Sequence, residues 1–148
     1  MYKQILIATD GSAGARGAVS EGLDFAEETG ADVLFVAIRQ PPIPVFGDPY
    51  WQQSLSNELA RLRPALQEAV AEAESRGIHA DYDLLEGDPG ERILELARSR
   101  DADLIVIGSR RPGAVAPVIL GSVSKRVLHD ADRPVLVVNE TAAVPVRT

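Results

Sequence analysis

The sequence predicts one α/β domain in which a five-stranded parallel sheet carries helices on both faces. Short apolar runs alternate along the chain with longer segments whose apolar residues recur every three or four positions. Most of the short runs are apolar throughout, which is typical of parallel strands buried on both faces. The length of 148 residues suits a single domain, and we find no internal repeat or low-complexity segment.

The first part of the chain predicts two strands around a helix. Residues 4–8 form a short apolar run that ends in turn residues, which indicates a buried strand. Residues 13–29 have apolar positions at helical spacing and stop before a glycine. Residues 32–38 form the second apolar strand, and the four prolines and one glycine of residues 39–50 predict a loop.

The middle of the chain predicts a long helix, a strand and a further helix. Residues 51–76 show a helical pattern, which we expect Pro64 to kink or break. Residues 78–85 alternate partly between polar and apolar positions, as a strand near a sheet edge does. Residues 86–89 then form a turn that opens a helix with an apolar stripe.

The last part predicts a buried strand, a loop, a helix and a final strand. The apolar run of residues 104–107 stops at Gly108, and a loop with two arginines and two prolines follows. A helix opens at Gly121–Ser122 and is followed by a strand over 134–139. We therefore expect one domain over residues 1–140 and a C-terminal tail over residues 141–148.

Composition narrows the function. The formal net charge of −7 argues against binding to nucleic acid or an anionic membrane surface, and no apolar run is long enough to span a membrane. The N-terminus begins a strand almost at once, so we expect no signal peptide. The absence of cysteine fits a cytoplasmic protein. Because the two histidines, His79 and His129, lie far apart in sequence and the chain has no cysteine, we expect no metal site in the protein.

The predicted sheet brings two strand ends together. If the strand order is 3-2-1-4-5, Asp10 after the first strand and Gly108 after the fourth face each other at the carboxyl ends of the sheet, where such folds bind ligands. The backbone N–H groups at the start of a helix favour an anion. We therefore predict that the loop between Gly108 and Gly121–Ser122 holds phosphate.

Five segments in order resemble the universal stress protein family, and the match runs from residue 3 to about residue 139. They are Ile5–Ser12, Glu86–Pro89, Ala102–Arg110, Gly121–Ser124 and Arg133–Val138. The resemblance implies a Rossmann-like domain with the 3-2-1-4-5 order. It also implies homodimers paired through the last strand, here Pro134, Val135, Leu136, Val137 and Val138. An apolar edge strand of this kind needs a partner.

The family divides into members that bind ATP and members that do not. The ATP-binding members carry Gly-x2-Gly-x9-Gly-[Ser/Thr], which matches Gly108 and Gly121–Ser122 here, but Arg111 stands at the second glycine. A side chain there could block the phosphates, and Gly113 restores flexibility only at another register. Conversely, Arg110 and Arg111 could donate to phosphate oxygens, or simply be solvated.

By this resemblance, ATP is the expected ligand, with Mg²⁺ held through the phosphates and with AMP and ADP as alternatives. Asp10 would contact the ribose, and the backbone of Ile38 would face the adenine. The other residues assigned to the site are Ala8, Thr9, Gly108, Arg110, Arg111, Gly113, Gly121, Ser122 and Val123. Asp10 and Ser122 could instead act as helix caps.

The leading functional interpretation is an adenine-nucleotide binding and sensing protein of the stress response. The alternative is a family member that binds no nucleotide and acts through dimerisation and protein partners. We disfavour an enzyme of phosphoryl or nucleotidyl transfer because no histidine falls in the predicted pocket. We therefore assign no catalytic residue, and slow ATP hydrolysis is the most activity that we expect.

Overall fold

The computed structural model describes residues 2–12, 15–40, 51–109 and 121–139, with residues 51–59 described through their backbone alone. Strands and helices alternate along the chain. In order they are β1 (Gln4–Ala8), α1 (Ala15–Thr29), β2 (Asp32–Arg39), α2 (Trp51–Ser75), β3 (Ala80–Glu86), α3 (Pro89–Ser99), β4 (Leu104–Ser109), α4 (Ser122–Asp130) and β5 (Val135–Asn139).

The strands form one parallel sheet in the order β3-β2-β1-β4-β5, which confirms the predicted fold class. The central strand β1 pairs with β2 on one side and with β4 on the other, so that Ile7 lies opposite both Phe35 and Val106. The direction of winding changes at β1. The carboxyl ends of β1 and β4 are therefore adjacent, with helices leaving them on opposite faces of the sheet.

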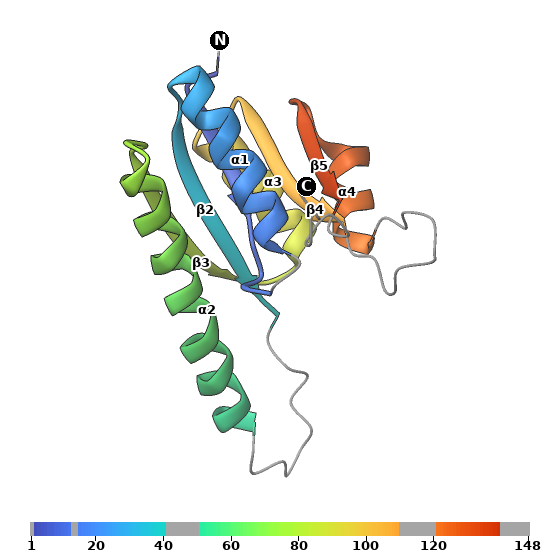
Figure 1. Ribbon diagram of the computed structural model, residues 1–148. Helices are drawn as coiled ribbons and strands as arrows, with labels where there is room; N and C mark the ends of the chain where they lie inside the picture. The colour runs from blue at the N-terminus through green and yellow to red at the C-terminus, as the bar shows by residue number, and fades with distance from the viewer. Residues whose placement is uncertain (1, 13–14, 41–50, 110–120, 140–148) are drawn as a thin grey trace.

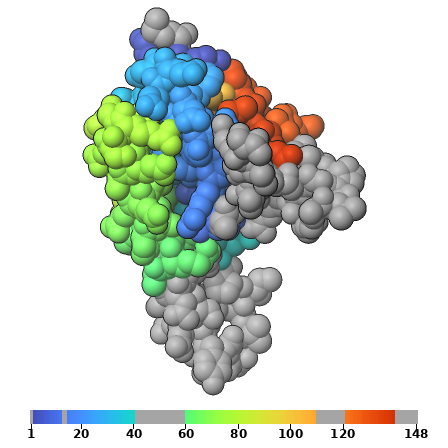
Figure 2. All heavy atoms as spheres, viewed as in Figure 1, coloured from blue at the N-terminus to red at the C-terminus, as the bar shows by residue number. Residues whose placement is uncertain are grey.

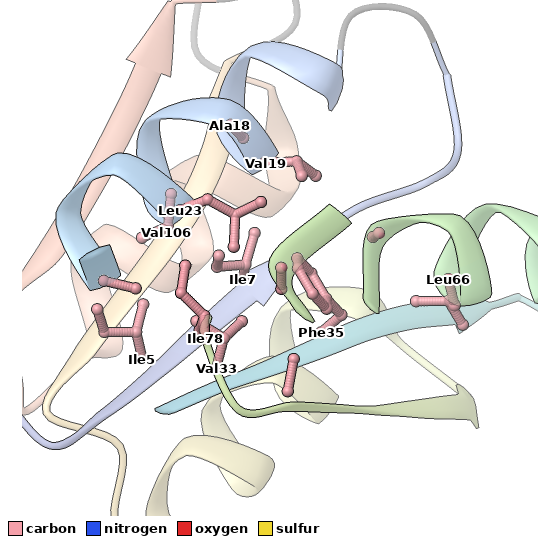
Figure 3. Close-up of a cluster of buried hydrophobic side chains, with 14 of the residues drawn as sticks. Ile5, Ile7, Ala18, Val19, Leu23, Val33, Phe35, Leu66, Ile78 and Val106 are labelled. Carbon is pink, nitrogen blue, oxygen red and sulfur yellow. The ribbon is translucent and has the colours of Figure 1, made fainter. Parts of the chain in front are cut away.

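Two helices cover each face of the sheet (Figure 1). Figure 2 shows the face on which α1 and α2 lie side by side. Beneath them is an apolar core that includes Ile5, Ile7, Phe35 and Leu66, part of which is drawn in Figure 3. A second core, between the sheet and the helices α3 and α4, includes the fully buried Ile105. Burial on both faces explains why the strands read as continuous apolar runs.

Pro64 does not break α2, which is one helix from Trp51 to Ser75. Pro64 is exposed, and so is Ala60, whose carbonyl would otherwise accept from the missing N–H. Water can therefore satisfy that carbonyl, which lowers the cost of proline inside the helix. Strand β4 also continues further than the sequence predicted, through Gly108 to Ser109.

Both edge strands of the sheet are half-buried along much of their length. At one edge, β3 is half-buried along most of its length, as its partial alternation predicted. At the other edge, Val135, Leu136 and Val137 of β5 are also half-buried. Among the described residues, no helix is long and apolar enough to cross a membrane. The predicted tail, residues 141–148, lies outside the described part of the chain.

Candidate functional site

A cleft of about 560 Å³ opens at the carboxyl ends of β1, β2 and β4. Helices α3 and α4 begin at its wall, and α2 passes along the opposite side. All predicted site residues that the structure describes line this cleft, namely Ala8, Thr9, Asp10, Ile38, Gly108, Gly121, Ser122 and Val123. Arg110, Arg111 and Gly113 lie outside the described residues. The binding role of each of these residues stays a prediction.

The start of α4 offers backbone donors to the cleft. Gly121 is the N-cap residue, with φ −69° and ψ 170°, and it supplies no side-chain cap. Ser122 is the first helical residue, so the alternative that Ser122 is the N-cap is wrong. The first intrahelical bond in this turn runs from the Lys125 N–H to the Gly121 carbonyl. The N–H groups before Lys125 have no acceptor within the helix, and they carry the positive end of its dipole.

The start of α3, at the same cleft, is capped by the carboxylate of Asp88. Asp88 is the N-cap of α3, and its Oδ2 atom accepts a hydrogen bond from the Glu91 N–H at 3.0 Å. Pro89 follows in the first turn, where its lack of an N–H costs no helical bond. The interpretation of Asp88–Pro89 as a helix start is therefore confirmed. Of the two helix starts, only that of α4 is left without a side-chain cap.

The turn after β1 holds the carboxylate of Asp10. Asp10 Oδ1 accepts from the Ser12 N–H at 2.9 Å, and Thr9 Oγ1 accepts from the Gly11 N–H at 3.2 Å. Gly11 has a φ of +76°, which a residue with a side chain rarely adopts. At the start of α1, the Ala15 N–H donates to Oγ of Ser12 at 3.2 Å. Ser12 thus supplies an acceptor for the N–H group of the first described residue of α1.

Buried serines tie the end of β4 to its neighbours. Ser124, in the first turn of α4, donates its hydroxyl to the Gly108 carbonyl at 3.1 Å. Ser109 is fully buried, and its hydroxyl lies 3.4 Å from the Val138 carbonyl of β5. The first bond ties the end of β4 to the start of α4, and the second ties it to β5.

An ion pair joins the ends of β2 and β3. Arg39 is buried, and its Nη2 atom lies 2.7 Å from Glu86 Oε2, while within the described residues its Nη1 atom has no hydrogen-bond partner. The Arg39 carbonyl accepts from the Gly87 N–H at 3.0 Å, and the Glu86 carbonyl accepts from Arg92 Nε at 3.0 Å. These contacts hold the turn that leads from β3 to Asp88 and the wall of the cleft.

Two arginines that the sequence analysis did not assign to the site also line the cleft. Arg61 of α2 donates from Nη1 to the Asp10 carbonyl at 2.7 Å. Arg126 of α4 donates from Nε to Asp130 at 2.7 Å, and its Nη1 atom lies 3.8 Å from Asp88 Oδ2. Arg126 follows Ser122 by four positions, so helical spacing could have indicated it. No local signal points to Arg61, because its contact depends on how α2 packs.

Asp130 keeps Arg126 in place over a wide pH range. Hydrogen bonds, first from His129 and then from Arg126, lower the pKa of this carboxyl below its ordinary value. Asp130 therefore stays ionised to a lower pH than an isolated aspartate does. Its charge also weakens the positive field that Arg126 contributes to the cleft.

The cleft combines three kinds of surface. Val36, Ile38 and Ile93 give an apolar wall that suits a flat ring, and Asp10 gives an acceptor that suits sugar hydroxyls. The open start of α4 gives donors that suit an anion. Among the described residues, no group of three or more histidine, aspartate or glutamate side chains is arranged to hold a metal ion.

Comparison with known proteins gives consistent matches over nearly the whole chain. The sequence model of the Universal stress protein family matches residues 1–139. A universal stress protein of Thermus aquaticus is 39% identical over 139 residues, which cover 93% of this chain and 99% of that protein. A universal stress protein of Methanocaldococcus jannaschii is 34% identical over 144 residues, which cover 95% of this chain and 84% of that protein. The solved structure of a universal stress protein in complex with cAMP is 25% identical in sequence and has a TM-score of 0.70. The match covers 94% of this chain and 98% of that one.

Proposed function

Because this chain belongs to the universal stress protein family, we propose that it binds an adenine nucleotide in the cleft and acts as a nucleotide sensor in a stress response. ATP with Mg²⁺ is the ligand that we propose, with AMP and ADP as the alternatives. The complex of a related universal stress protein with cAMP supports an adenine nucleotide as the class of ligand. We assign no catalytic residue to this function.

The observation that carries the proposal is the uncapped start of α4. A phosphate at this position would accept from the backbone N–H groups of Ser122 and Val123, as anions do at helix starts. The ribose would then lie toward Asp10, and the adenine toward Ile38 and the apolar wall. These groups line one cleft, so a single ligand can reach all three.

The residues present fit a nucleotide whose Mg²⁺ comes with the phosphates. Mg²⁺ is commonly bound by substrate phosphates and waters with few protein ligands. Bound in this way, the ion would neutralise part of the triphosphate charge. The chain would then need to supply only main-chain donors and the guanidinium groups near the cleft.

A charge placed at Ser122 tests the proposal. Ser122→Asp puts a carboxylate at the start of α4, which the helix dipole tolerates or favours, so the fold should stay at least as stable. The same carboxylate would repel phosphate. We expect ATP affinity, measured by calorimetric titration of nucleotide-stripped protein, to fall by at least about tenfold, which corresponds to about 1.4 kcal/mol.

Ser122→Asn is the matched control, because it has nearly the same shape without the charge. It should bind ATP within about threefold of the original chain, a difference of under about 1 kcal/mol. Equal affinities of the two variants would contradict the phosphate position. An absence of binding heat for ATP, ADP and AMP at two temperatures would instead favour the alternative, a family member that acts through protein partners.

We also propose that two copies pair through β5. Its residues from Val135 to Val137 are half-buried apolar side chains on an edge strand, and edge strands offer unpaired backbone groups. A second β5 related by a two-fold axis would satisfy those groups. Light scattering at micromolar concentration should give the mass of a dimer, and the mass of a monomer would contradict this part of the proposal.

A further inference from the structure

The cleft extends around the end of the sheet to the side of α2. Val36 and Ile93 belong to the core beneath α3 and α4, whereas Ala15 and Leu62 belong to the layer of α1 and α2, and all of them line the cleft. Asp10 lies between these two parts. A nucleotide with its ring and 5′-phosphate on the side of α3 and α4 would therefore leave the side of α2 unused.

Among the described residues that line the cleft, Arg61 carries the positive charge on that unused side. Its Nη1 atom donates to the Asp10 carbonyl at 2.7 Å and lies 3.5 Å from the position that a Cβ atom on Gly11 would occupy. The guanidinium group therefore rests on the turn that carries Asp10. A guanidinium has five N–H donors in a planar fork, and one bond to a carbonyl leaves others able to meet an anion.

The carboxylate of Asp10, next to this position, is held by its own turn. Asp10 Oδ1 accepts from the Ser12 N–H at 2.9 Å, which spreads part of its charge into the turn. Of the other described residues that line the cleft, Ala15 and Leu62 belong to this side, and both are apolar. A second phosphate here would meet Arg61 as its charged partner.

We propose that Arg61 is a specificity-determining residue for adenine nucleotides that carry a second phosphate on a ribose hydroxyl. This inference rests on the proposed function, because it takes the ribose to lie at Asp10. The 2′- and 3′-hydroxyls of such a ribose would face Asp10, and the guanidinium of Arg61 sits on the carbonyl of the same residue. A phosphate ester on either hydroxyl would form charge-assisted hydrogen bonds with it.

The test is a set of calorimetric titrations on the full chain, stripped of nucleotide, with four ligands. These are AMP, ADP, adenosine 3′,5′-bisphosphate and adenosine 2′,5′-bisphosphate. ADP carries its extra phosphate on the 5′ side. Comparing ADP with the bisphosphates therefore distinguishes an effect of where the second phosphate lies from an effect of the added charge. The variant is Arg61→Gln. Arg63→Gln is the control, because Arg63 is an exposed arginine on the same helix that does not line the cleft.

We expect one of the two bisphosphates to bind about tenfold more tightly than AMP, equivalent to about 1.4 kcal/mol. Arg61→Gln should bring that ratio close to one and leave the ratio of ADP to AMP unchanged, while Arg63→Gln should change neither. The preferred isomer distinguishes a 3′-phosphate, as in coenzyme A, from a 2′-phosphate, as in NADP.

Two results would overturn the inference while the proposed function stands. In one, AMP binds and neither bisphosphate exceeds it in the original chain. In the other, Arg61→Gln weakens AMP and the bisphosphates by the same factor, which would make Arg61 a positioning residue for the Asp10 turn. Failure of every ligand to bind would overturn the proposed function itself, and the inference with it.

Discussion

Two glycines of α1 give opposite predictions for the same substitution. A Cβ atom on Gly22 would lie 2.5 Å from Cδ1 and 2.9 Å from Cγ1 of Ile7 in β1. A Cβ atom on Gly17, in the same helix, would meet only Val138 Cγ1, at the ordinary distance of 3.7 Å. We therefore predict that Gly22→Ala destabilises the protein and that Gly17→Ala stabilises it.

The magnitudes follow from two opposing terms. Alanine in place of glycine gains about 1 kcal/mol in helix propensity at either position. At Gly22 the added methyl group also overpacks the core, which typically costs about 1–3 kcal/mol. Ile7 is fully buried between α1 and the sheet and has little room to move (Figure 3). The expected net effects are a loss of about 1 kcal/mol for Gly22→Ala and a gain of up to about 1 kcal/mol for Gly17→Ala.

Denaturation in urea, followed by circular dichroism, measures both effects. Because each variant gains the same helix propensity, the difference between their free energies of unfolding isolates the overpacking cost, about 2 kcal/mol. Ile7→Val removes the Cδ1 atom, so in the double variant it should recover part of the loss caused by Gly22→Ala. Equal stabilities of Gly22→Ala and Gly17→Ala would refute the reasoning.

Three further predictions concern the ends of the strands. Glu86→Ala should lower the free energy of unfolding by about 2 kcal/mol, because it leaves the buried Arg39 without its carboxylate. Glu95→Ala, which breaks an exposed ion pair, should lower it by under about 0.5 kcal/mol. Chemical denaturation of the two variants measures both values. Ser124→Ala should cost about 1 kcal/mol in thermal unfolding by removing the bond to the Gly108 carbonyl, and an unchanged midpoint would contradict that role. The Lys3 and Gln4 N–H groups hold the pKa of Asp103 below its ordinary value. The contribution of Asp103 to the free energy of unfolding is therefore present above the unfolded pKa and is lost as pH falls through the lowered value. Asp103→Asn should be less stable than the original chain at pH 7 and equally stable in acid, and a difference in stability that stays constant with pH would contradict this.

The strands of the sheet could be predicted from the sequence because their signals are local, whereas the 3-2-1-4-5 order was implied by the resemblance to the universal stress protein family. The apolar runs mark buried strands, and the position of Asp10 and Gly108 at strand ends follows directly from where those runs stop. The helix start at Asp88 could also be predicted from the sequence, because aspartate followed by proline is common at the start of a helix. Each of these features depends on a few consecutive residues.

The features that the sequence did not reveal depend on packing between distant segments. Arg61 reaches Asp10 across 51 positions, and its contact exists only because α2 lies against the turn after β1. The pair between Arg39 and Glu86 depends on the register between two strands that are joined by the whole of α2. The continuity of α2 through Pro64 likewise depends on which side of the helix faces water.

The two helix starts at the cleft show how the same fold assigns different roles to equivalent positions. Asp88 satisfies a backbone donor of α3 with a carboxylate from the chain itself, whereas Gly121 leaves those of α4 for another acceptor. The donors of α4 are main-chain groups, so they do not depend on the arginine that stands at position 111 in place of the motif glycine. In the proposed site, a ligand with one phosphate would rely on the N–H groups of α4, whereas the loop that carries Arg111 is expected to matter for a longer phosphate chain. If the cleft binds both nucleotides, comparing the ratio of ATP to AMP affinity between this chain and Arg111→Gly would measure what the departure from the family motif changes.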